Sequence, residues 1–197
     1  MAQSQLVENL LGALDVMLSR STGMKRMDLT PKGFWNSFYG LLITALVDMI
    51  ALSLSHPTVV SRMGDAAPEK FYFVFGNLTA ALVGYASAML ALFLLCRDES
   101  EARGFPTSLA VHNWASPVIS IAILPIIFIT ELTRTQGQTG VLETFLMISI
   151  IAALIVAGIR ILRISLLLTP GRASAYFAIT TLVSLSISQG LESIMGL

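Results

Sequence analysis

Five long apolar blocks alternate with short polar segments along the chain. Each block is long enough to cross a hydrocarbon layer of about 30 Å as an α-helix. The short connections predict one compact helical domain. The predicted spans are residues 34–55, 71–96, 109–132, 141–168 and 174–195. Thr30 and Pro31 supply an N-cap and a first helical residue for the first span. We therefore expect an all-α fold, a polytopic membrane helix bundle of about five transmembrane helices.

A shorter segment before the first block has the pattern of an amphipathic helix. Within residues 3–20, apolar side chains from Leu6 to Leu18 recur at helical spacing. The side chains on the opposite, polar face are Gln5, Glu8, Asn9, Asp15 and Ser19. We expect this helix at the membrane interface or docked on the bundle. Residues 1–30 then form a cytoplasmic N-terminal segment, and residues 31–197 form the five-span transmembrane domain.

Composition supports a membrane protein. Hydrophobic residues make up 55% of the 197 residues and charged residues only 12%, whereas a soluble domain carries about a quarter charged residues. Residues 1–33 do not resemble a secretory signal, so insertion is expected to depend on the first span. The net charge is zero, so a nucleic-acid partner is not expected.

The distribution of basic residues predicts the orientation, because cytoplasmic loops are enriched in lysine and arginine. Nine basic residues fall on the side of the N-terminus and three on the other. The nine are Arg20, Lys25, Arg26, Lys32, Arg97, Arg103, Arg160, Arg163 and Arg172, and the three are Arg62, Lys70 and Arg134. The N-terminus is thus expected inside and the C-terminus outside. An even number of spans would require that one apolar block does not cross the membrane. Residues 141–168 or 174–195 are then the blocks most open to such an error.

The first span carries a polar stripe at intervals of four residues. Its members are Asn36, Gly40, Thr44 and Asp48, which stack on one helix face. A carboxylate inside the membrane is costly and usually faces protein or water. Asn77 and Gln189 fall at a similar depth, so these two and Asp48 form a candidate buried polar site.

Two interpretations of Asp48 remain open. In the first, which is favoured, the carboxylate belongs to an interhelical hydrogen-bond network that sets the packing. In the second, it is a proton or cation site open to the outer side, with Glu143 and Glu192 as further acids near that boundary. Pro117 and Pro125 add kinks to the third span, and they free the backbone carbonyls of Asn113 and Ile121.

Two other groups of residues are candidates for packing and for lipid contact. Gly76, Ala80, Gly84 and Ala88 place a small residue at every fourth position of the second span, a pattern typical of close helix contacts. Their partner is expected within the chain, with another protomer as the alternative. Arg160 and Arg163 share one helix face near the inner boundary. They could snorkel, pair with Asp98, Glu99 or Glu101, or bind an anionic lipid.

The sequence lacks the signals of common catalytic and metal sites. It contains no Walker A loop, no HExxH and no GxSxG. The single Cys96 excludes an internal disulfide or cysteine cluster, and two histidines are too few for a histidine metal site. We therefore expect a non-enzymatic protein without a cofactor or metal.

The order of parts resembles the Yip family of small membrane proteins, with a cytoplasmic N-terminal segment, five spans and a C-terminus soon after the last span. The stretch KGFWNSF (32–38) is similar to the sequence before the first span of bacterial Yip-like proteins, as is Phe105-Pro106-Thr107 leading into His112-Asn113-Trp114. The resemblance covers nearly the whole chain. In eukaryotes this family works in vesicle traffic and binds small GTPases.

These observations lead to two functional hypotheses. The first is a Yip-like scaffold, assembly or trafficking-type partner of other membrane proteins, with the small-residue face and the N-terminal helix as contact surfaces. The alternative is a small transporter or channel component with a buried acidic site at Asp48. Expected partners are membrane lipids, other membrane proteins or further copies of the chain. Arginine outnumbers lysine nine to three, which favours a bacterial inner membrane as the location.

Overall fold

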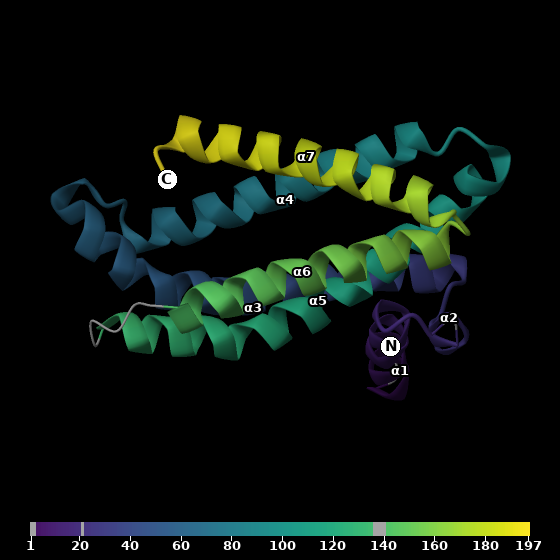
Figure 1. Ribbon diagram of the computed structural model, residues 1–197, viewed down its shortest axis with the longest axis horizontal. Coiled ribbons are helices and arrows are strands. Elements are labelled where there is room, and N and C mark those ends of the chain that lie inside the picture. Colours follow the sequence, from purple (N-terminus) through teal and green to yellow (C-terminus); the bar gives the residue numbers. More distant parts are fainter. Residues whose placement is uncertain (1–2, 21, 136–140) are drawn as a thin grey trace.

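The computed structural model describes residues 3–20, 22–135 and 141–197, with their side chains except those at 3, 62, 66, 133–135, 142 and 143. The described residues form helices and no strand, so the predicted all-α class is confirmed (Figure 1). The elements are α1 (Gln3–Met17), α2 (Gly23–Arg26), α3 (Pro31–Met63), a 3-10 turn η1 (Gly64–Ala66), α4 (Lys70–Leu95), α5 (Glu99–Thr135), α6 (Val141–Ser165) and α7 (Pro170–Met195).

Five of these helices, α3 to α7, are long and apolar enough to cross a membrane. The candidate spans are Pro31–Ser61, Lys70–Leu95, Glu99–Leu132, Thr144–Ser165 and Pro170–Met195. The predicted membrane helix bundle with an N-terminal helix is therefore confirmed, and the chain is an integral membrane protein.

The helix boundaries differ from the predicted spans mainly at prolines. α3 continues through Pro57 to Met63, although the first span was predicted to end at residue 55. α5 begins at Glu99 and includes Pro106, although its span was predicted to begin at residue 109. Glu99 and Glu101 lie in its first turn, where carboxylates favour a helix N-terminus. The prediction placed these polar turns in connectors because hydropathy alone marks the part of a helix that lies in lipid.

α3 and α7 begin in the same way, with a threonine N-cap followed by a proline. Thr30 accepts a hydrogen bond from the Gly33 backbone amide, as the Thr30–Pro31 order predicts, and Pro31 stands at the first turn. Thr169 accepts from the Arg172 amide in front of α7, again with a proline next in sequence. Both caps satisfy backbone donors that the first helical turn leaves open.

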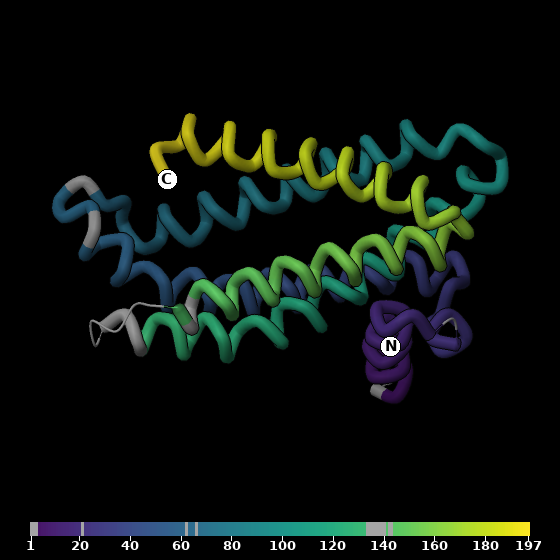
Figure 2. Tube along the Cα trace, in the orientation of Figure 1, coloured from purple at the N-terminus to yellow at the C-terminus, as the bar shows by residue number. Residues whose placement is uncertain are grey.

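The five long helices form two layers (Figure 1). α4 packs mainly on α7 in one layer, and α3 packs mainly on α5 in the other, with α6 beside α5 and α7. The chain alternates in direction from span to span (Figure 2). The N-terminal segment and the α4–α5 and α6–α7 connections lie at one end of the bundle, which we call the N-terminal end. The C-terminus lies at the other end, where the Tyr72 hydroxyl of α4 donates to the Met195 carbonyl over 2.7 Å.

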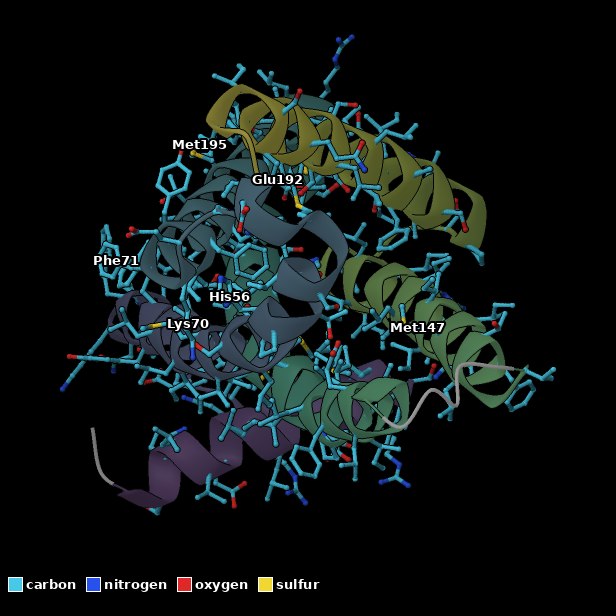
Figure 3. The ribbon with its side chains drawn as sticks, turned by 90° about the vertical axis from the view of Figure 1, so that its left-hand side faces the viewer. His56, Lys70, Phe71, Met147, Glu192 and Met195 are labelled. Atoms are coloured by element: carbon cyan, nitrogen blue, oxygen red, sulfur yellow. The ribbon has the colours of Figure 1, made fainter. Side chains whose placement is uncertain are left out.

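α1 runs across the long axis of the bundle near its N-terminal end (Figures 1 and 3). Its buried residues Ala13 and Val16 pack on Val111 and Trp114 of α5 and on Ile161 of α6. Docking on the bundle was one of the two expected positions for this helix.

The predicted division of α1 into an apolar and a polar face is wrong at Asn9. This residue was assigned to the polar face, yet it is fully buried. Its side-chain oxygen accepts hydrogen bonds from the Asp28 amide and from Gln5. These donors satisfy the buried side-chain oxygen, whereas the side-chain nitrogen of Asn9 has no hydrogen-bond partner among the described residues.

Candidate functional site

Asp48 lies near the middle of α3 and therefore near the middle of a candidate span. It is half-buried, and it lines a cavity of about 220 Å³ between α3, α4 and α5. The Ser120 side chain on α5 interacts with the Asp48 carboxylate. The residues that line the cavity are Leu41, Thr44, Ala45, Asp48, Leu78, Ala81, Leu82, Tyr85 and Ser116.

The cavity combines one carboxylate with three hydroxyl groups. Thr44, one turn before Asp48, donates its hydroxyl proton to the Gly40 carbonyl over 3.0 Å, which leaves the oxygen free to accept. Tyr85 and Ser116 contribute hydroxyls from the two neighbouring helices. None of the described residues lining this cavity is basic. The carboxylate is therefore surrounded by neutral polar and apolar groups.

A hydrogen-bond network lies next to the cavity, toward the N-terminal end. The Tyr85 hydroxyl of α4 donates to the side-chain oxygen of Asn113 on α5. The Asn113 amide donates over 2.8 Å to Ser37 of α3, which in turn donates to the Phe34 carbonyl. Asn113 and Ser37 are fully buried. Three helices are thus joined by polar side chains whose donors and acceptors are paired.

Gly40 allows α3 and α5 to approach closely beside this network. A Cβ atom at Gly40 would lie 2.9 Å from the Asn113 carbonyl carbon and closer still to the carbonyl oxygen. Pro117 lacks the amide proton that would otherwise bond this carbonyl. The freed oxygen faces the Gly40 backbone instead, where a weak Cα–H contact can partly satisfy it.

A second cavity of about 220 Å³, lined by residues of α4, α5, α6 and α7, contains further polar groups. Tyr85 and Ser116 line both cavities. The second cavity adds His112 of α5 and the hydroxyls of Thr180, Thr181 and Ser184 on α7. Polar side chains thereby extend from Asp48, past Tyr85 and Ser116, to the α7 side of the bundle.

The predicted grouping of Asp48 with Asn77 and Gln189 does not form. The Asn77 amide donates to the Phe73 carbonyl of its own helix over 2.7 Å, and Asn77 does not line the Asp48 cavity. Gln189 is exposed on α7, which packs on α4 rather than on α3. Equal depth in the membrane brought these residues together in the prediction, but depth does not specify which way each helix is rotated.

The two further acids of the predicted outer site are also apart from Asp48. Glu192 is half-buried near the end of α7, in the layer opposite α3 (Figure 3). The side chain of Glu143 lies outside the described residues. Near the same end, the Thr58 hydroxyl of α3 donates to Glu131 of α5, a carboxylate that the sequence analysis did not select.

The small-residue face of α4 is covered by α7. Gly76, Ala80, Gly84 and Ala88 are all buried. A Cβ atom at Gly84 would lie 2.8 Å from the Ser188 hydroxyl and 2.9 Å from the Ser184 carbonyl oxygen. The partner of this face is thus another helix of the same chain, and the face is not a surface open to a second protein.

Arg160 and Arg163 lie near the C-terminal end of α6, beside α1. Arg160 donates to the Met17 carbonyl at the end of α1 over 3.0 Å. The acids considered as their partners have other contacts. Arg172 pairs with Asp98 and Glu101, and Arg103 pairs with Glu99.

A group of interacting polar side chains, which we call the Arg172 cluster, was not selected by the sequence analysis. It consists of Arg172, Tyr176, Asp98 and Glu101. Glu101 is only 3% exposed and lies 2.7 Å from Arg172. The Tyr176 hydroxyl accepts from Arg172 and lies within hydrogen-bond distance of the Leu95 carbonyl and Glu101. The i, i+4 spacing of Arg172 and Tyr176 was the available signal. Their partners at the end of α4 and the start of α5 come close to them only in the folded bundle.

No protein-family model, curated protein or solved structure matches this chain. Among the described residues, no group of three or more histidine, cysteine, aspartate or glutamate side chains could hold a metal ion.

Proposed function

We propose that this chain is a small membrane transporter or channel component that binds a proton or small cation at Asp48. The observation that carries the proposal is the position of this carboxylate, near the middle of a span and on the wall of a cavity. A carboxylate at that depth lacks bulk water, and its cavity offers no basic partner among the described residues. A proton or small cation neutralises such a group at the lowest cost.

The surrounding hydroxyls support transfer as well as binding. Thr44, Tyr85 and Ser116 can each accept and donate hydrogen bonds, so they can pass a proton or replace part of the hydration shell of a cation. The second cavity shares Tyr85 and Ser116 and brings in His112. The transferred species then moves from Asp48 toward the α7 side through groups that are already adjacent.

Flux across liposomes containing only the full chain tests this proposal. We expect a pH or cation gradient to dissipate faster than in empty liposomes, and Asp48→Asn to abolish the difference. Asp65→Asn, which removes an exposed carboxylate on η1, is the matched control. Dyes for protons and for sodium or potassium ions distinguish the transported species. Wild-type flux equal to that of empty liposomes, or unchanged flux in a folded Asp48→Asn protein, refutes the proposal.

A second candidate is the non-enzymatic assembly role of Yip type. One observation favours it, because no described side chain of α6 from Thr144 to Val156 is buried, although α6 packs on α5. This apolar surface is open to another membrane protein or to another copy. Membership of the Yip family itself stays a prediction. A stable monomer in mild detergent that captures no membrane protein would remove this candidate, whereas a defined complex lost on Ala153→Trp would favour it.

We place the chain in a bacterial inner membrane with the N-terminus in the cytoplasm. The N-terminal end of the bundle contains the N-terminal segment, the α4–α5 connection and the α6–α7 connection. The nine basic residues counted on that side lie in these segments and in the ends of α3, α5, α6 and α7 that adjoin them. The side chains of Arg62 and Arg134, counted on the other side, lie outside the described residues. A reporter fused after Leu197 is expected outside the cell, and a cytosolic reporter would overturn this orientation.

A further inference from the structure

A groove of about 690 Å³ lies where α1, α2 and the end of α6 meet. Its polar lining consists of Arg160, Arg163, Ser19 and Ser165, and its apolar lining includes Met24 and Ile164. We infer that this groove binds the phosphate of an anionic phospholipid, with Arg160 and Arg163 as its ligands. This site is separate from the Asp48 cavity and does not depend on the function proposed for it.

The charge of the groove favours an anion. Arg160 uses one N–H group on the Met17 carbonyl, and Arg163 is exposed. Neither arginine forms an ion pair with an acid in the described part of the chain, and no acid lines the groove. Since a guanidinium carries five N–H donors, most donors of both side chains remain available for phosphate oxygens.

The acids at the same end of the bundle form ion pairs with other arginines. Asp15 of α1 contacts Arg20 and Arg26 at 3.2 and 3.3 Å. Glu101 and Asp98 contact Arg172. The positive charge at the groove is therefore not neutralised by the carboxylates that lie at the same end of the bundle.

The surroundings of the groove identify a lipid rather than a free phosphate ion. α1 lies across the bundle, as a helix does at a membrane interface. It exposes an apolar stripe at helical spacing, made of Val7, Leu11, Leu14 and Leu18. On α6, Val156 and Ala152 are exposed one and two turns before Arg160 in the sequence, and therefore farther from the N-terminal end of the bundle. An acyl chain can follow these residues while the phosphate stays between the arginines.

The backbone beside the groove is also held in an uncommon conformation. Ser19 and Leu167 both line the groove, and both adopt left-handed backbone angles, with φ of 66° and 54°. Leu167 is 90% exposed, which in water is unfavourable for a large apolar side chain. Insertion of this leucine among lipid chains removes that exposure and places the groove at headgroup depth.

The test uses the purified, delipidated full chain in mild detergent with phosphatidylglycerol or phosphatidylcholine as the probe. Native mass spectrometry measures the fraction of protein that retains lipid. We expect phosphatidylglycerol to bind more tightly, and Arg163→Gln to weaken it about fivefold, since one interfacial basic charge contributes about that factor. Arg163→Lys keeps the charge and is expected to retain most of the affinity.

Arg103→Gln is the matched control, because Arg103 is exposed at the same end but pairs with Glu99. It should leave phosphatidylglycerol binding unchanged. Because Arg163 contacts no described acid, its glutamine variant is expected to fold, and thermal unfolding of the same sample verifies this. Equal retention of the two lipids, or equal effects of Arg163→Gln and Arg103→Gln, overturns the inference. Displacement of the lipid by millimolar inorganic phosphate also overturns it, because the site would then select the ion alone.

Discussion

The close contact between α3 and α5 can be tested by adding a single methyl group at Gly40. In Gly40→Ala, the new Cβ would lie 2.9 Å from the Asn113 carbonyl carbon and 3.4 Å from the Trp114 ring. The first neighbour is backbone, so it cannot move away by rotating a side chain. The two helices must separate, and their separation stretches the hydrogen bonds from Asn113 to Ser37 and from Tyr85 to Asn113.

The expected loss of stability combines two contributions. Overpacking a close contact costs about 2 kcal/mol, and two interhelical hydrogen bonds in a membrane protein contribute about 0.6 kcal/mol each, so the loss is about 3 kcal/mol. Reversible unfolding in mixed detergent and sodium dodecyl sulfate measures it. Fluorescence of the fully buried Trp114 in a Trp35→Phe background reports on this contact, since Trp35 is exposed.

Gly190→Ala is the control for the same substitution in a helix. A Cβ atom there meets nothing within 4 Å, so we expect no loss of stability. Alanine is also the better helix former, which would favour the variant slightly. If Gly40→Ala and Gly190→Ala unfold at the same denaturant concentration, the close approach of α3 and α5 is refuted.

Two further predictions concern the Arg172 cluster and the neighbouring Cys96. Arg172→Gln leaves the buried Glu101 without its ion pair, so it should unfold earlier than the exposed-pair control Arg103→Gln; equal midpoints would contradict this role. Burial, followed by the charge of Glu101, raises the pKa of the Cys96 thiol to about 11. Because only the thiolate reacts, maleimide labelling of the folded chain should be slow at neutral pH and rise about tenfold per pH unit toward that value. Fast labelling at pH 7 would contradict the buried position.

Most of the fold was predictable from hydropathy, but the relations between helices were not. The five spans follow from apolar blocks of sufficient length, and the structure has five such helices. The sequence placed Asp48, Asn77 and Gln189 together because they share a depth. In the structure, Ser116, Ser120 and Tyr85 surround Asp48 instead. Small hydroxyl side chains are common in membrane helices, so their spacing did not distinguish them as neighbours of a carboxylate.

The Arg172 cluster illustrates the same difference for charged residues. The sequence offered Arg160 and Arg163 as partners for Asp98, Glu99 or Glu101, because all lie at one boundary. In the structure, Arg172 forms ion pairs with Asp98 and Glu101 because α7 begins beside the α4–α5 connection. Arg160 and Arg163 are thereby left without acidic partners in the described part of the chain, which creates the positive groove.

The sequence by itself determined that this chain enters a membrane as five helices with another helix before them. The physical reason is that lipid cannot hydrogen-bond to the backbone, so any long apolar segment must satisfy its own amides as a helix. Only the tertiary structure decided which helix faces meet. Close packing depends on the rotation and proximity of whole helices, which brings Gly84 to Ser184 and Gly40 to Asn113. The same geometry leaves Asp48 on a cavity and two arginines in an open groove.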